Sequence, residues 1–118
     1  MNIATKKVKD AIAEVTGGWN PSDPRFPGVK QAMLDFTKFS GVKLLGDEAE
    51  VEVADIERTF DILTDYFETD ENLNFACGAV QSLAELADGL DLPKTGDRLY
   101  TVLDALEDQK VRAENGED

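Results

Sequence analysis

Residues 49–67 read AEVEVADIERTFDILTDYF, and this stretch decides the fold. Its apolar side chains recur at intervals of four, three, four, three and four positions. They are Ala49, Val53, Ile56, Phe60, Leu63 and Phe67. Such spacing places all of them along one face of a helix. The stretch therefore predicts a helix over residues 47–68 that buries one stripe against its neighbours.

The first residues of that stretch allow a second interpretation. Glu50-Val51-Glu52-Val53 alternates charged and apolar side chains, as a half-buried strand does. A short apolar segment, residues 42–45, precedes it and can serve as a partner strand. A short β-hairpin near residues 42–53 is thus the alternative to the first turn and a half of the helix.

Four more helices are predicted by the same spacing, over residues 3–16, 28–39, 70–89 and 96–113. Their expected inner positions are Ile3, Val8, Ala11, Ile12 and Val15; Val29, Ala32, Met33, Phe36 and Phe39; Leu73, Cys77, Val80, Leu83 and Ala87; and Leu99, Val102, Leu103 and Leu106. The expected N-cap is Asp70 for the helix over residues 70–89, and either Thr95 or Asp97 for the helix over residues 96–113. The sequence thus predicts an all-α fold, a compact bundle of about five helices. It forms one domain, residues 1–113, followed by a disordered acidic tail at 114–118.

Net charge divides the chain into two unequal parts. The whole chain of 118 residues carries −13. Residues 1–46 hold seven basic and four acidic side chains, a net charge of +3, whereas the other 72 residues hold 21 acidic and five basic, a net charge of −16. Such a field repels nucleic acid and anionic lipid and attracts basic protein surfaces. We therefore expect a protein partner with a basic surface, no direct nucleic-acid partner and no membrane.

Several kinds of chemistry are unexpected in this sequence. Histidine is missing, and with it the commonest general base and the commonest transition-metal ligand. Asp70, Asn72 and Asn74 have the spacing of the first ligands of a calcium loop, but Phe75 stands where glycine is needed. The single cysteine, Cys77, lies on an inner helix position, which favours a packing role and a reducing compartment. We expect a cytoplasmic protein that is not an enzyme and uses neither cofactor nor metal.

Acidic residues are concentrated between residues 47 and 71, a stretch that holds eleven acidic residues and one basic residue, Arg58. Like-charge pairs four residues apart, such as Glu57/Asp61 and Asp61/Asp65, cost roughly 0.2–0.5 kcal/mol each in a helix. This surface either keeps the protein in solution or binds a basic partner. Trp19 and Phe26 flank a proline-rich connector, where they either anchor a partner or fold back onto the bundle. The candidate partner-binding residues are Glu50, Glu57, Asp61, Asp65, Glu68, Asp104, Asp108, Trp19 and Phe26.

The leading hypothesis is a non-enzymatic inhibitor that occupies a basic, nucleic-acid-handling surface of another protein. Small size, missing histidine and concentrated acidity are also typical of phage-encoded anti-defence and toxin-neutralising inhibitors, an analogy of composition alone. Mimicry of nucleic acid requires two coplanar acidic helices, because acids one turn apart are separated by about 6 Å and duplex charges by about 1.7 Å.

Two alternatives remain open. The first is a structural or assembly protein, an adaptor or chaperone subunit such as one of a phage particle, which binds through apolar packing. The second is a homo-oligomer formed through the small residues Ala76, Gly78 and Ala79 of the fourth helix.

Overall fold

A computed structural model describes residues 1–116 as five helices with a small two-stranded sheet. The elements in chain order are β1 Asn2–Ala4, α1 Thr5–Gly17, α2 Phe26–Phe39, the 3-10 helix η1 Val42–Leu44, β2 Glu50–Glu52, α3 Val53–Glu68, α4 Leu73–Gly89 and α5 Pro93–Glu114. The predicted all-α bundle is confirmed. Of the tail predicted over 114–118, Glu114 ends α5, and residues 117–118 lie outside the described part of the chain.

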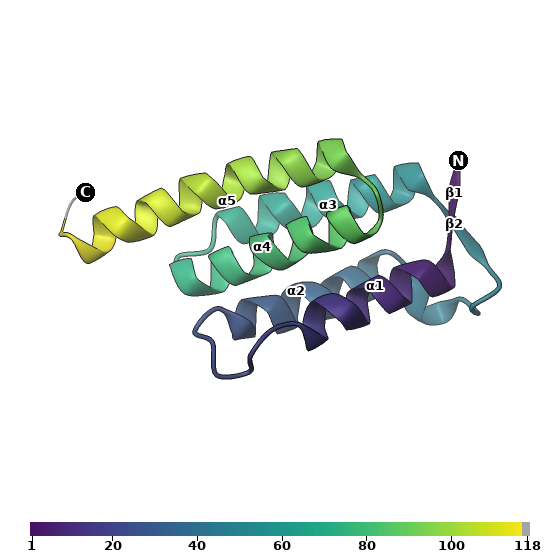
Figure 1. Cartoon of the computed structure of the whole chain (residues 1–118). Coiled ribbons are helices and arrows are strands. Elements are labelled where there is room, and N and C mark those ends of the chain that lie inside the picture. The colour runs from purple at the N-terminus through teal and green to yellow at the C-terminus, as the bar shows by residue number, and fades with distance from the viewer. Residues whose placement is uncertain (117–118) are drawn as a thin grey trace.

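Helix α4 lies at the centre of the bundle and contacts each of the other four helices. Figure 1 shows α1 and α2 on one side of it, with α3 and α5 on the other. The five residues from Ala76 to Val80 are all buried, as a central position requires. Between the two sides, the rings of Phe36 in α2 and Phe60 in α3 meet with centroids 4.6 Å apart. The core is therefore continuous through the whole bundle.

The apolar stripe of residues 49–67 enters the core only over part of its length. Ile56, Phe60, Leu63 and Phe67 are buried, as predicted. However, α3 begins at Val53 rather than at residue 47, because residues 50–52 form strand β2. Val51 lies opposite Ile3 in an antiparallel pair, so the strand interpretation holds for this segment.

The partner of β2 differs from the expected one. Residues 42–44 form η1, and β2 instead pairs with β1 at the start of the chain. The pairing buries Ile3, which was expected on a helix, and it delays the start of α1 to Thr5. Thr5 then donates its backbone N–H to Ala49 at 2.9 Å, a contact between segments far apart in sequence.

Three helix starts and one inner position also differ from expectation. Helix α2 begins at Phe26, and α4 begins at Leu73, where Asn72 rather than Asp70 is the N-cap and accepts from the backbone N–H of Phe75 at 3.1 Å. Helix α5 begins at Pro93, since proline suits a first turn where its missing N–H has no partner to lose. Phe39 is 59% exposed, because α2 ends there and the chain returns to bury Val42 instead.

Small residues bring α2 and α4 unusually close together. A Cβ atom on Gly28 would lie 2.0 Å from the carbonyl oxygen of Phe75, and one on Gly78 would lie 1.9 Å from that of Arg25. The small-residue face of α4 is thus covered within the monomer. It is not available as an interface between copies of the chain.

Candidate functional site

The charge asymmetry of the sequence becomes an asymmetry between the two sides of the bundle. Residues 1–46, with a net charge of +3, include α1, α2 and η1. Residues 47–116 carry 19 acidic and five basic side chains, a net charge of −14, and include α3, α4 and α5. The surplus of acid lies mainly on α3, in residues 47–52 before it and at the two ends of α4. Figure 1 shows α3 on the side of α4 opposite α1 and α2.

Helix α3 separates its acids from its core residues. Glu57, Asp61 and Asp65 lie on consecutive turns, and Glu68 ends the helix. All four side chains are exposed, while the buried stripe occupies another face of the same helix. Glu50 is exposed on β2, three residues before the start of α3. We call these five residues the acidic ridge.

An arginine from another helix reaches the acidic ridge. Arg98 of α5 pairs with Asp61 through Nη1 and lies 3.2 Å from Asp65 through Nη2. The five acids and this arginine carry a net charge of −4. Sequence reasoning missed Arg98 because it lies 37 residues from Asp61, and no periodic pattern connects the two positions.

Helix α5 contributes acids without adding much net charge. Asp104 and Asp108 are exposed, and Asp108 pairs with Arg112 one turn further along. The helix holds five acidic and four basic residues, a net charge of −1, whereas α3 holds five acidic and one basic, a net charge of −4. A duplex as long as α3, about 24 Å by helix rise, carries about 14 charges. The two helices are neighbours, yet they reach only part of the charge density of a nucleic acid.

The two aromatic candidates fold back onto the bundle. Trp19 and Phe26 are both half-buried against the core, and Trp19 donates its Nε1 proton to Glu85 Oε1 at 2.8 Å. Trp19 also forms one wall of a surface cleft of about 480 Å³. The cleft lies between the C-terminal end of α1, the connector after it and α4. Two stretches of chain build it, residues 14–23 and residues 81–85, so the sequence has no local signal that α4 closes one side of it.

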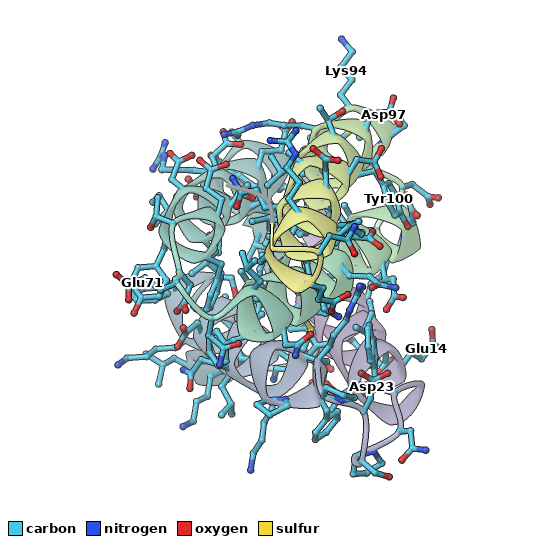
Figure 2. All side chains as sticks on the ribbon, turned by 90° about the vertical axis from the view of Figure 1, so that its left-hand side faces the viewer. Glu14, Asp23, Glu71, Lys94, Asp97 and Tyr100 are labelled. Atoms are coloured by element: carbon cyan, nitrogen blue, oxygen red, sulfur yellow. The ribbon has the colours of Figure 1, made fainter. Side chains whose placement is uncertain are left out.

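Glu14 and Asp23 belong to the walls of the same cleft. Figure 2 shows these two acids on one side of the bundle, with Glu71 on the opposite side. The ridge lies on β2 and α3, whereas residues of α1, the connector and α4 line the cleft, so the two are distinct acidic features. Within residues 1–116, no three His, Cys, Asp or Glu side chains converge closely enough to hold a metal ion.

The surroundings of two titratable side chains, Cys77 and Tyr100, raise their pKa values. Burial raises the pKa of the Cys77 thiol, which makes it a poor nucleophile. Burial, together with a hydrogen bond of 2.9 Å from the Tyr100 hydroxyl to Asp88, raises the pKa of Tyr100 to about 12. Both groups stay protonated at neutral pH, Cys77 as a packing residue and Tyr100 as a donor.

In comparisons with protein families, curated proteins and solved structures, the chain shows no significant match. Over the described residues, no helix combines the length and apolarity needed to cross a membrane.

Proposed function

We propose that this is a non-enzymatic binding protein whose acidic ridge occupies a basic surface on a partner protein. The observation that carries the proposal is the division of α3 into a buried apolar stripe and an exposed acidic one. The acids are not needed to complete the core. Their crowding on one helix is mildly unfavourable to folding, so a binding role accounts for it better than a stabilising one.

Three acids of the ridge have no ion-pair partner among residues 1–116. They are Glu50, Glu57 and Glu68, which lie before, on and at the end of α3. Unpaired carboxylates steer a basic partner during association and lose no internal contact when it arrives. The finer form of this proposal is that the partner's basic surface normally holds nucleic acid, because such surfaces are rich in lysine and arginine.

The test reverses the unpaired acids and leaves the Arg98 pairs intact. The variant Glu50→Lys/Glu57→Lys/Glu68→Lys is immobilised beside the wild type and exposed to a lysate of the source cells at low ionic strength. We expect a protein held by the wild type to be lost by this variant and to be released by salt. The matched control, Lys30→Glu/Lys38→Glu on α2, should retain it.

Two outcomes separate the forms of the proposal. If the triple variant holds the same proteins as the wild type, the ridge is only a solvated surface and the proposal is wrong. If the partner is captured but added nucleic acid does not displace it, the finer form is wrong while the general one stands.

A second candidate function, an assembly role through apolar contacts, is favoured by the surface of α2 and η1. Leu34, Phe39 and Leu44 are 57%, 59% and 90% exposed. Lys30, Lys38 and Lys43 surround them in sequence, and none makes an ion pair among the described residues. Association through this surface should persist at high salt and be abolished by Leu34→Asp/Leu44→Asp. Association through the ridge should instead be lost at high salt and should survive Leu34→Asp/Leu44→Asp.

A further inference from the structure

The cleft beside Trp19 has room for a side chain of a partner and walls that suit a cationic one. It is an open surface cleft of about 480 Å³ between α1, the connector and α4. Trp19 is half-buried, and its hydrogen bond to Glu85 holds the indole in one orientation. An aromatic ring held in this way provides a fixed surface on which a flat or cationic group can stack.

The charged groups around the cleft are of one sign. Glu14 comes from α1, Asp23 from the connector and Glu85 from α4, and no basic side chain lines the cleft. Arg25 is already held by two partners: its Nη1 donates to Gln81, which also lines the cleft, at 2.8 Å, and its Nη2 lies 3.4 Å from Glu107. None of the three acids makes an ion pair with any described residue. Glu14, Asp23 and Glu85 therefore lack a cationic partner within residues 1–116.

The kind of cation follows from the spacing of the walls. The carboxylates do not converge closely enough to hold a metal ion. A larger cation that reaches several carboxylates at once and also stacks on an indole suits the cleft better. Guanidinium has both properties, because it is planar, always charged and able to donate to carboxylates in pairs. Ammonium is compact and more strongly hydrated, so it stacks less well.

We propose that this cleft receives an arginine side chain of the basic partner. The inference rests on the proposed function for the source of the arginine, but the chemistry of the cleft can be tested without the partner. Arginine in the cleft would stack on Trp19 and pair with Glu14 and Asp23. The ridge would then supply long-range attraction, and the cleft would supply the orientation of the bound partner.

Trp19 is the only tryptophan in the chain, so its fluorescence reports directly on the cleft. The probe is N-acetylarginine amide, titrated at constant ionic strength. The matched control is N-acetylcitrulline amide, which has nearly the same shape without the charge. We expect a saturable change with the arginine probe, in the millimolar range typical of a single side chain. The citrulline probe should cause no such change, and N-acetyllysine amide should bind more weakly than the arginine probe.

Variants locate the response. Glu14→Gln and Asp23→Asn should each weaken binding of the arginine probe by about three- to tenfold, as expected for a charge-assisted contact near the surface. Glu85→Gln keeps an oxygen that accepts from Trp19 while it removes the charge. The control Glu71→Gln, on the opposite side of the bundle (Figure 2), should leave the affinity unchanged. Equal responses to arginine and citrulline, or no effect of Glu14→Gln and Asp23→Asn, would overturn the proposal.

The two proposals fail in different ways. If reversing the ridge abolishes capture of a partner but Trp19 does not respond to the arginine probe, the cleft proposal is wrong and the binding function stands. If Trp19 responds as expected but capture is insensitive to the ridge, the cleft proposal stands and the function assigned to the ridge is wrong.

Discussion

The contact between α2 and α4 and the contact between α3 and α5 are built in opposite ways. At the first, Gly28 and Gly78 let the two backbones approach so closely that a single added carbon would overlap a carbonyl oxygen. At the second, Arg98 reaches between two exposed carboxylates. Backbone shape determines the first contact, whereas flexible side chains in solvent make the second.

The difference separates the surfaces that hold the fold from those that are free to bind. A contact without spare volume tolerates few substitutions, because interiors are close-packed and backbones cannot be displaced cheaply. A solvent-exposed ion pair stabilises little, because water screens it. The outer face of α3 can therefore carry unusual charge, while its inner face and the α2–α4 contact maintain the structure.

The largest effect is expected on the inner face of α3. Phe60 is fully buried against Phe36, so Phe60→Ala should lower the free energy of unfolding by roughly 3–5 kcal/mol. Ile62→Ala is the control on the same helix, since Ile62 is 55% exposed and should change stability by less than about 1 kcal/mol. Urea denaturation followed by circular dichroism measures both. Equal losses would mean that the two faces of α3 do not differ as described.

A smaller loss is expected at the α2–α4 contact. Gly78→Ala should cost about 1–3 kcal/mol, because the new methyl group must push the backbone at Arg25 away. Gly17→Ala is the matched control, because no atom lies near its Cβ position and alanine restricts the unfolded chain. It should leave stability unchanged or slightly raise it. If Gly78→Ala left the free energy of unfolding unchanged in the same experiment, α2 and α4 would be less tightly packed than the approach of Gly78 to Arg25 indicates.

The contact between α3 and α5 should matter least to folding. Arg98→Ala removes two exposed ion pairs and should cost no more than about 1 kcal/mol. It also makes the ridge more negative, so partner capture at low ionic strength should be retained or strengthened. A loss of several kcal/mol in thermal or urea unfolding would place Arg98 among the residues that hold the bundle together.

The effect of pH on Tyr100 is confined to alkaline solution. Its pKa is about 12 in the folded protein against an ordinary value of 10.0, because burial and the bond to Asp88 favour the protonated form. The stability that follows is complete below pH 10 and is lost as pH rises toward 12. Tyr100→Phe should flatten this part of the stability curve. Asp88→Asn should lower the pKa of Tyr100 in a spectroscopic titration, and an unchanged value would remove Asp88 as a cause.

Local periodicity was sufficient to predict the helices but not their ends. The stripe from Ile56 to Phe67 predicted the buried face of α3, because apolar side chains at helical spacing have one energetically favourable arrangement. The same stripe suggested an earlier start, since Ala49 and Val53 continue the spacing. Instead, Val51 pairs with Ile3 in a small sheet, so the helix begins only at Val53. That pairing joins residues 48 positions apart in the sequence.

By itself, the sequence determined the all-α class, the number of helices, most of the core and the crowding of acids after residue 46. These properties depend on composition and on spacing within one turn or one helix. Only the tertiary structure decided that the small residues of α4 face α2, that Arg98 joins the ridge and that Trp19 forms a cleft with Gln81 and Glu85 of α4. Each of these features unites side chains from separate elements. Their distances depend on how helices pack against one another, and no periodic pattern along one helix encodes that arrangement.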